Sequence, residues 1–175
     1  MSASAAARPA NTDVPRSFTY QELRRVGFTR RKIDHLLATG RLHRLRKGFY
    51  VPSDIPSAFR RAGELGGRTD CLSLLRHLGV FVLDHSVLHV QLNPWSGRLP
   101  PPTDEVIRHW RASTAAPGDL GTGAIEALVQ ACRCQPPRAA VATLDSAWHL
   151  GLISETHLDQ ISRRCRIGTR FSGLC

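Results

Sequence analysis

Two matched helix starts and a basic hairpin, all within residues 18–52, constrain the fold of this chain most strongly. Thr19 and Thr29 each follow a phenylalanine, and each hydroxyl can accept a hydrogen bond from a first-turn amide that has no partner inside the helix. Gly27 and Gly40 mark the ends of the two helices. A positively charged hairpin completes the segment. Helix, turn, helix and hairpin are the outline of a winged helix-turn-helix, which we expect here.

The two helix starts differ in charge. Glu22 stands three residues after Thr19 and completes a capping box, whereas Lys32 takes the same place after Thr29. A cation in the first turn opposes the helix dipole at a cost of about 0.3–1 kcal/mol. A phosphate bound at this terminus would supply the missing negative charge. We therefore expect the start of the second helix to face an anion.

Positive charge is concentrated in the same region. From Arg16 to Lys47 the chain has ten cations and two anions, so this segment carries +8 of a net charge of +10. A concentrated basic region indicates a polyanionic partner. The alternative is a charged face that meets only solvent, and for any single arginine both interpretations remain open.

Helical spacing separates the inward from the outward side chains of the second helix. Ile33, Leu36 and Leu37 form an apolar stripe, and Leu23 with Val26 is expected to do the same for the first helix. Recognition helices read bases mainly from their N-terminal half. Base contacts are expected from Arg30, Arg31 and Asp34, phosphate contacts or capping from Thr29 and Lys32, and wing contacts from Arg41, Arg44, Arg46 and Lys47. With the outward-facing His35, the candidate DNA-binding residues are Thr29, Arg30, Arg31, Lys32, Asp34, His35, Arg41, Arg44, Arg46 and Lys47.

The remainder of the chain predicts an α+β fold, in which the winged helix-turn-helix precedes a small mixed α/β region and C-terminal helices. Residues 1–17 are rich in Ala, Ser, Pro and Asn and are expected to be a disordered tail; residues 165–175 are expected to be an unanchored tail. Residues 57–164 are expected to form an α+β domain. Its predicted elements are helices over 57–65, 70–78, 125–134, 138–150 and 154–164, and strands over 80–83, 88–92 and 106–110.

No pattern in the sequence indicates an active site, a cofactor or a metal. Cys132 and Cys134 are not a CxxC pair, and two cysteines at this spacing on a helix point in different directions. His89 and His109 lie in predicted strands and can face one another, for which packing or a hydrogen bond is the expected reason. Catalytic and nucleotide-binding motifs are absent. No signal peptide and no apolar run of about 20 residues is found, so we expect a cytoplasmic protein.

The segment Phe18 to Pro52 resembles the N-terminal winged-helix domain of AbiEi-type antitoxins, the transcription-repressing halves of type IV toxin–antitoxin systems. The residues that carry this resemblance are Thr19, Leu23, Gly27, Thr29, Ile33, Leu36, Gly40, Leu42, Leu45, Gly48 and Tyr50. Further on, the chain looks like an actinobacterial group in which an AbiEi-like N-terminus precedes a very-short-patch-repair-like endonuclease domain. This second likeness rests on residues 67–80, Leu88-His89-Val90, His109-Trp110 and residues 141–147.

The resemblance implies a duplex-DNA-binding regulator that represses transcription from its own operator. One departure matters, because residues 166–175 contain no acidic side chain where longer relatives continue into the nuclease. A truncated or catalytically empty member of the nuclease family is therefore an alternative. A second alternative is an antitoxin module that binds a cognate toxin through residues 57–164. The oligomeric state is not encoded in any pattern that we can read.

Overall fold

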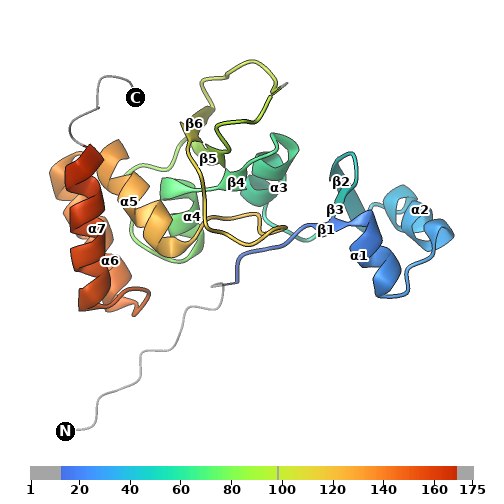
Figure 1. Cartoon of the computed structure of the whole chain (residues 1–175), viewed down its shortest axis with the longest axis horizontal. Coiled ribbons are helices and arrows are strands. Elements are labelled where there is room, and N and C mark those ends of the chain that lie inside the picture. The colour runs from blue at the N-terminus through green and yellow to red at the C-terminus, as the bar shows by residue number, and fades with distance from the viewer. Residues whose placement is uncertain (1–12, 98, 169–175) are drawn as a thin grey trace, which may run out of the picture.

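Two small three-stranded sheets organise the chain, each with helices packed beside it (Figure 1). The computed structural model describes residues 13–97 and 99–168, and within these it has seven helices. The fold class is therefore α+β, as predicted. None of the helices in these residues is long and apolar enough to cross a membrane.

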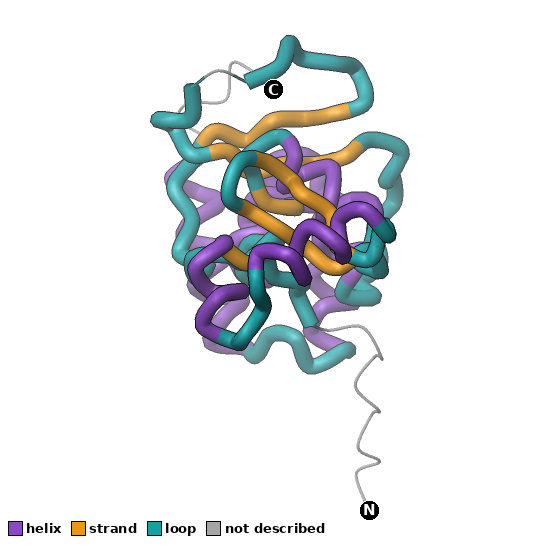
Figure 2. Tube along the Cα trace, turned by 90° about the vertical axis from the view of Figure 1, so that its right-hand side faces the viewer, coloured by secondary structure: helices purple, strands orange, loops and turns teal. Residues whose placement is uncertain are grey.

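The first sheet belongs to residues 18–52, which we call the N-terminal unit. Its elements are β1 (Phe18–Thr19), α1 (Tyr20–Arg25), α2 (Arg30–Ala38), β2 (Leu42–Arg46) and β3 (Phe49–Pro52). The strand order is β1-β3-β2, and both pairings are antiparallel. The predicted helices and hairpin are present, and β1 adds a short strand that the sequence did not indicate. Seen from its free end, this unit stands in front of the rest of the molecule (Figure 2).

The helix caps form as predicted. Thr19 Oγ1 accepts from the Glu22 amide at 3.2 Å while Glu22 Oε2 accepts from the Thr19 amide at 2.7 Å, which makes a complete capping box. Thr29 Oγ1 accepts from the Lys32 amide at 3.2 Å, without a reciprocal acidic side chain. At the end of α1, Gly27 has φ +91°, and the hydrogen bonds to Arg24 O and Leu23 O around it form a Schellman motif.

A small core holds the N-terminal unit together. Leu23, Ile33, Leu42 and Tyr50 are buried in it, and Phe28, Leu36 and Leu37 pack against them. Val26 does not join this core, contrary to the prediction, and is 70% exposed. Val26 is the C-cap residue of α1, so it stands at the end of the helix rather than within its buried face.

The second sheet belongs to residues 57–168, which we call the second unit. Its elements in chain order are α3 (Ser57–Glu64), β4 (Arg68–Thr69), α4 (Cys71–His77), β5 (Leu88–Leu92), β6 (Val106–Trp110), α5 (Ala124–Cys134), α6 (Pro137–His149) and α7 (Glu155–Gly168). The strand order is β4-β5-β6, with β4 antiparallel and β6 parallel to the central β5. The predicted strands at residues 88–92 and 106–110 are confirmed.

The strand predicted at residues 80–83 is wrong. Val80 and Val82 are buried while Phe81 and Leu83 are exposed, so the alternation typical of a strand is present without a partner strand. The Val80 amide instead bonds to Leu75 O at the end of α4, and the Phe81 amide bonds to Ser146 Oγ on α6. Buried and exposed side chains alternate here because only one side of this irregular segment packs against the core.

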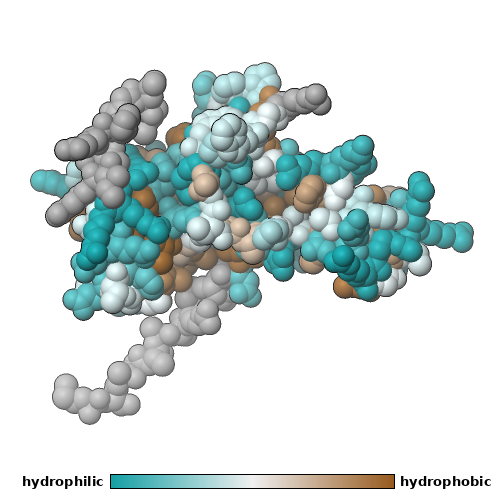
Figure 3. Space-filling view, in the orientation of Figure 1, coloured by the Kyte–Doolittle hydropathy of each residue, from teal (hydrophilic) through white to brown (hydrophobic). Residues whose placement is uncertain are grey.

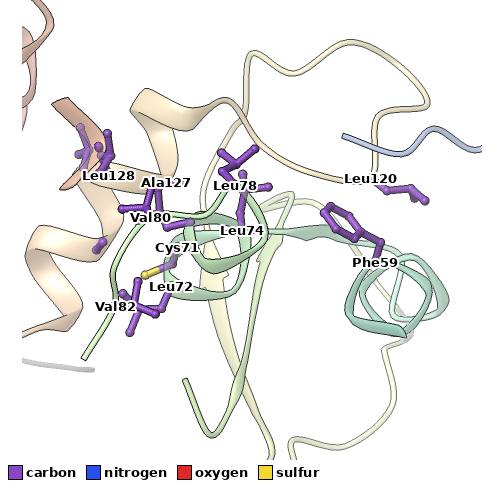
Figure 4. Close-up of a cluster of buried hydrophobic side chains, with 14 of the residues drawn as sticks. Phe59, Cys71, Leu72, Leu74, Leu78, Val80, Val82, Leu120, Ala127 and Leu128 are labelled. Atoms are coloured by element: carbon purple, nitrogen blue, oxygen red, sulfur yellow. The ribbon is translucent and has the colours of Figure 1, made fainter. Parts of the chain in front are cut away.

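A large apolar core joins α4 and α5 and reaches into the N-terminal unit. Leu74, Leu75 and Leu128 are fully buried in it, and Figure 4 shows Phe59 and Leu120 at its other end. Leu45 from the hairpin belongs to this core rather than to the small one. The hairpin therefore has one face on α1 and α2 and the other on the second unit.

Both predicted tails differ in part from the structure. Residues 13–17 contact the loop before α5: the Ser17 amide bonds to Gly118 O at 2.7 Å, and the Leu120 amide to Pro15 O at 2.9 Å. Arg16 Nε also pairs with Asp119 Oδ1 at 3.1 Å. The last helix continues past its predicted end to Gly168. Residues 1–12 and 169–175 lie outside the described residues.

Candidate functional site

Helix α2 projects its polar face at one end of the molecule. It begins after the Thr29 cap and buries Ile33 on its inner side. The predicted contact residues Thr29, Arg30, Arg31, Lys32, Asp34 and His35 are all exposed. In Figure 1, α2 lies at the end farthest from the C-terminal helices, and hydrophilic side chains gather there in Figure 3. The outer face of the helix is thus open to an incoming ligand.

Little of the positive charge on α2 is neutralised within the chain. Arg30 Nε lies 4.0 Å from Asp34 Oδ2, with the two side chains 85% and 68% exposed, and such a pair contributes about 0–1 kcal/mol. Arg31 and Lys32 form no salt bridge with any described residue. The first turn contains no acidic residue. The N-terminus of α2 therefore combines open backbone amides with uncompensated cations.

The hairpin and the residue before it carry four exposed cations, namely Arg41, Arg44, Arg46 and Lys47. Its turn lies against the start of α1, because the Tyr20 amide donates to Gly48 O at 3.2 Å. The register between β2 and β3 shifts between Arg44 and Arg46, so these two side chains do not follow simple alternation.

Arg46 is placed differently from the other candidates. Its guanidinium carbon lies 4.5 Å from the centre of the Phe49 ring, a cation–π contact. Its Nη1 is also close to Gly66, where an added Cβ would come within 3.0 Å of it. Gly66 follows α3, so Arg46 occupies the junction between the hairpin and the second unit. All ten predicted residues are thus exposed, and Arg46 in addition lies against the second unit.

The second unit contains a cluster that sequence reasoning did not assemble. Cys71, His89, His109 and Cys134 each direct one sulfur or ring nitrogen to a common point, and these four atoms lie within 4.8 Å of one another. His89 Nδ1 is 3.0 Å from His109 Nε2, which in turn is 4.0 Å from Cys134 Sγ. The prediction that the two histidines can face one another is confirmed; the two cysteines beside them were not expected.

The pKa values of the two thiols in this cluster are shifted in opposite directions. Burial raises the pKa of Cys71 well above its ordinary value, with the neighbouring Cys134 adding to the rise. The hydrogen bond from Cys71 lowers the pKa of Cys134, and contacts with His109, His89 and Gln130 lower it further.

A partly buried ion-pair network lies next to the cluster. Arg111 Nη2 donates to Asp70 Oδ1 at 2.7 Å, and Arg111 Nη1 donates to Glu126 Oε2 at 3.0 Å. Thr122 Oγ1 also donates to Asp70 Oδ1, at 2.6 Å. These contacts connect the residue before α4, the segment after β6 and the first turn of α5. They fix the elements from which three of the four cluster residues project.

No protein-family model matches this chain, and comparison with curated proteins finds no match.

Proposed function

We propose that residues 18–52 are a winged helix-turn-helix and that the protein is a duplex-DNA-binding transcriptional regulator. The observation that carries this proposal is α2, a capped helix at one end of the molecule whose exposed face is cationic and lacks acidic partners in its first turn. The second unit packs on the opposite face of the hairpin through Leu45, so it leaves the outer face of α2 accessible.

In this proposal α2 enters the major groove. Arg30 and Arg31 stand in its first turn, and an arginine can donate two hydrogen bonds to the O6 and N7 atoms of guanine. Asp34 lies one turn further and can accept from the amino group of cytosine. Thr29 and Lys32 flank the helix N-terminus, where a phosphate would meet the open amides and the positive end of the dipole.

The hairpin supplies contacts to the DNA backbone. Arg41, Arg44 and Lys47 are exposed on or beside it and can reach phosphates, which position the protein without reading sequence. The resemblance to AbiEi-type antitoxins favours a more specific form of the proposal, in which the operator lies in the protein's own promoter and binding represses transcription.

Affinity for duplex DNA at a series of salt concentrations tests the proposal. With about six phosphate contacts, the slope of log affinity against log salt is expected to be about −5. Fluorescence anisotropy with a random duplex and with the protein's own promoter measures both the slope and the preference. Absence of duplex binding at low salt would reject the proposal.

Paired substitutions separate base reading from charge alone. Arg30→Ala with Arg31→Ala is expected to remove most of the preference for the promoter over the random duplex. Arg163→Ala with Arg164→Ala makes the same charge change on exposed positions of α7 and is the matched control. Equal losses of promoter preference in the two double variants would contradict a reading role for α2.

A further inference from the structure

Four metal-ligating side chains converge inside the second unit from four different elements. Cys71 opens α4, His89 is on β5, His109 is on β6 and Cys134 ends α5. We propose that these residues bind a zinc ion, which ties the two helices to the sheet. This site is independent of the proposed DNA-binding face, which lies in the N-terminal unit.

The distances between the donor atoms suit a tetrahedral ion. With Zn–S bonds of about 2.3 Å and Zn–N bonds of about 2.0–2.1 Å, neighbouring ligand atoms of a tetrahedral site lie about 3.3–3.8 Å apart. Here the two nitrogens are 3.0 Å apart, the pair His109 Nε2 and Cys134 Sγ is 4.0 Å apart, and no pair among the four exceeds 4.8 Å. If the donor atoms moved by less than about one ångström, all four would reach the spacing of a tetrahedral zinc site.

The donor set selects the kind of metal. Two sulfurs and two imidazole nitrogens in a tetrahedral arrangement are typical of zinc, whereas calcium and magnesium take oxygen ligands. Two thiolates also balance the charge of Zn²⁺, so the metal with its four ligands has no net charge inside the protein. Four protein ligands leave no open position for a water or a substrate, and the site is therefore structural rather than catalytic.

Burial makes the cluster difficult to explain as ordinary polar packing. Cys71 and His89 are 0% and 2% exposed, and Cys71 belongs to the large apolar core with Leu72 and Val80 (Figure 4). Buried polar groups need partners, and metal coordination supplies one to every donor at once. Without a metal, the same atoms depend on one shared proton between the histidines and on weak thiol contacts.

The backbone at Cys71 supports the same conclusion. Among the described residues, Cys71 is the one non-glycine residue with a left-handed conformation, at φ +50°. A non-glycine residue is unfavourable in this conformation and keeps it only where several surrounding contacts hold the position. Here the flanking Asp70 is held by its amide bond to His89 O at 3.0 Å and by its side-chain bonds to Arg111 and Thr122. The strained residue is the one whose sulfur completes the cluster.

Supporting contacts orient the ligands. Ser73 Oγ accepts from the His89 amide at 2.9 Å, and Gln130 Nε2 donates to Cys134 Sγ at 3.3 Å. A hydrogen bond donated to the cysteine sulfur, such as this one, is expected where the sulfur is a thiolate ligand of a metal.

The experiment measures metal in the purified full-length protein and in two cysteine variants. Elemental analysis of wild-type protein is expected to give one zinc per chain, and Co²⁺ replacement is expected to give the ligand-field and thiolate charge-transfer bands of a tetrahedral site. Cys134→Ser is expected to weaken Zn²⁺ binding by more than roughly 100-fold, since loss of outer contacts alone costs about 10–100-fold. Cys132→Ser is the matched control, because Cys132 is on the same helix but interacts with Cys165 instead.

Two further measurements keep the test decisive if Cys134→Ser does not fold. In wild-type protein, a zinc chelator is expected to lower the melting temperature, and added Zn²⁺ to restore it. His109→Cys retains four ligands and is expected to keep stoichiometric Co²⁺ binding with a stronger thiolate band. Wild-type protein that takes up neither Zn²⁺ nor Co²⁺ would overturn the proposal, as would loss of binding in Cys132→Ser with retention in Cys134→Ser.

Discussion

Arg111 and Asp70 form a salt bridge of 2.7 Å in which the aspartate side chain is fully buried. The same guanidinium reaches Glu126 at 3.0 Å, so one arginine pairs with two carboxylates, one just before α4 and one in α5. The residues come from the start of α4, the end of β6 and the first turn of α5, and the network therefore fixes the corner of the second unit where the Cys/His cluster lies.

Replacing Arg111 with Met is expected to destabilise the protein by about 3–5 kcal/mol, because a buried carboxylate loses its counter-ion. Urea unfolding followed by circular dichroism measures the change. Arg61→Met is the control: Arg61 pairs with Glu105 on the surface, and its loss is expected to cost less than about 1 kcal/mol. Similar losses in both variants would show that the buried network has no special role.

The carboxylate of Glu126 predicts how stability depends on pH. Burial alone would raise its pKa, but hydrogen bonds from Thr114, Ser113 and Arg111 outweigh burial and lower the pKa from 4.5 to about 2. A folded-state pKa below the unfolded value means that the stabilisation is complete above pH 4.5 and is lost as the pH falls towards 2. The unfolding free energy is therefore expected to fall between neutral pH and about pH 3.

Glu126→Gln isolates this contribution. The variant keeps the shape of the side chain and lacks the titrating group, so its unfolding free energy is expected to be lower at neutral pH and to change less on acidification. Parallel pH profiles for wild type and variant would show that the acid sensitivity arises elsewhere.

Gly27 and Gly97 provide a matched pair for the turn between α1 and α2. An added Cβ meets nothing within 4 Å at either position, but Gly27 has φ +91° whereas Gly97 is outside the left-handed region. Gly27→Ala is expected to lower the unfolding free energy by about 1–2 kcal/mol, since L-residues pay this cost in the left-handed conformation. Gly97→Ala is expected to leave it unchanged or to raise it by up to about 1 kcal/mol. Thermal unfolding compares the two, and equal effects would mean that the turn is not under conformational constraint.

Local chemistry explains which features could be predicted from the sequence. The caps at Thr19 and Thr29 depend on residues three positions away, and both were predicted correctly. The strands at residues 88–92 and 106–110 were predicted from short apolar-rich segments, and the two pair with each other in the second sheet. Residues 80–83 are a continuous apolar run, yet no strand of the described residues lies beside them, so the pattern was misleading there.

Long-range contacts explain most of what the sequence did not reveal. Residues 13–17 bind a loop that follows them by about a hundred positions, and their own composition gives no sign of it. The four cluster residues are similarly dispersed, with no closely spaced ligand pair to suggest a metal site. The position of Arg46 depends on the Gly66 turn of the second unit, which no pattern within the hairpin encodes.

Arg44 and Arg46 separate the two roles that the hairpin has in this structure. Both side chains are exposed and form no salt bridge with a described residue, but Arg46 also stacks on Phe49 and lies against the second unit. Arg44→Ala is expected to weaken binding to promoter and random duplexes alike and to make the salt slope shallower by about 1, because it removes one phosphate contact. Arg46→Ala is expected to have a smaller effect on affinity and to lower the melting temperature, because it removes packing at the junction.

Anisotropy titrations at two salt concentrations, together with thermal unfolding of the same preparations, distinguish these outcomes. The sequence predicts wing contacts from both Arg46 and Lys47, so Lys47→Ala completes the comparison and is expected to behave like Arg44→Ala. If Arg46→Ala instead loses DNA affinity as strongly as these two while keeping its melting temperature, the guanidinium must leave Phe49 on binding. The hairpin would then contact the duplex along its whole length.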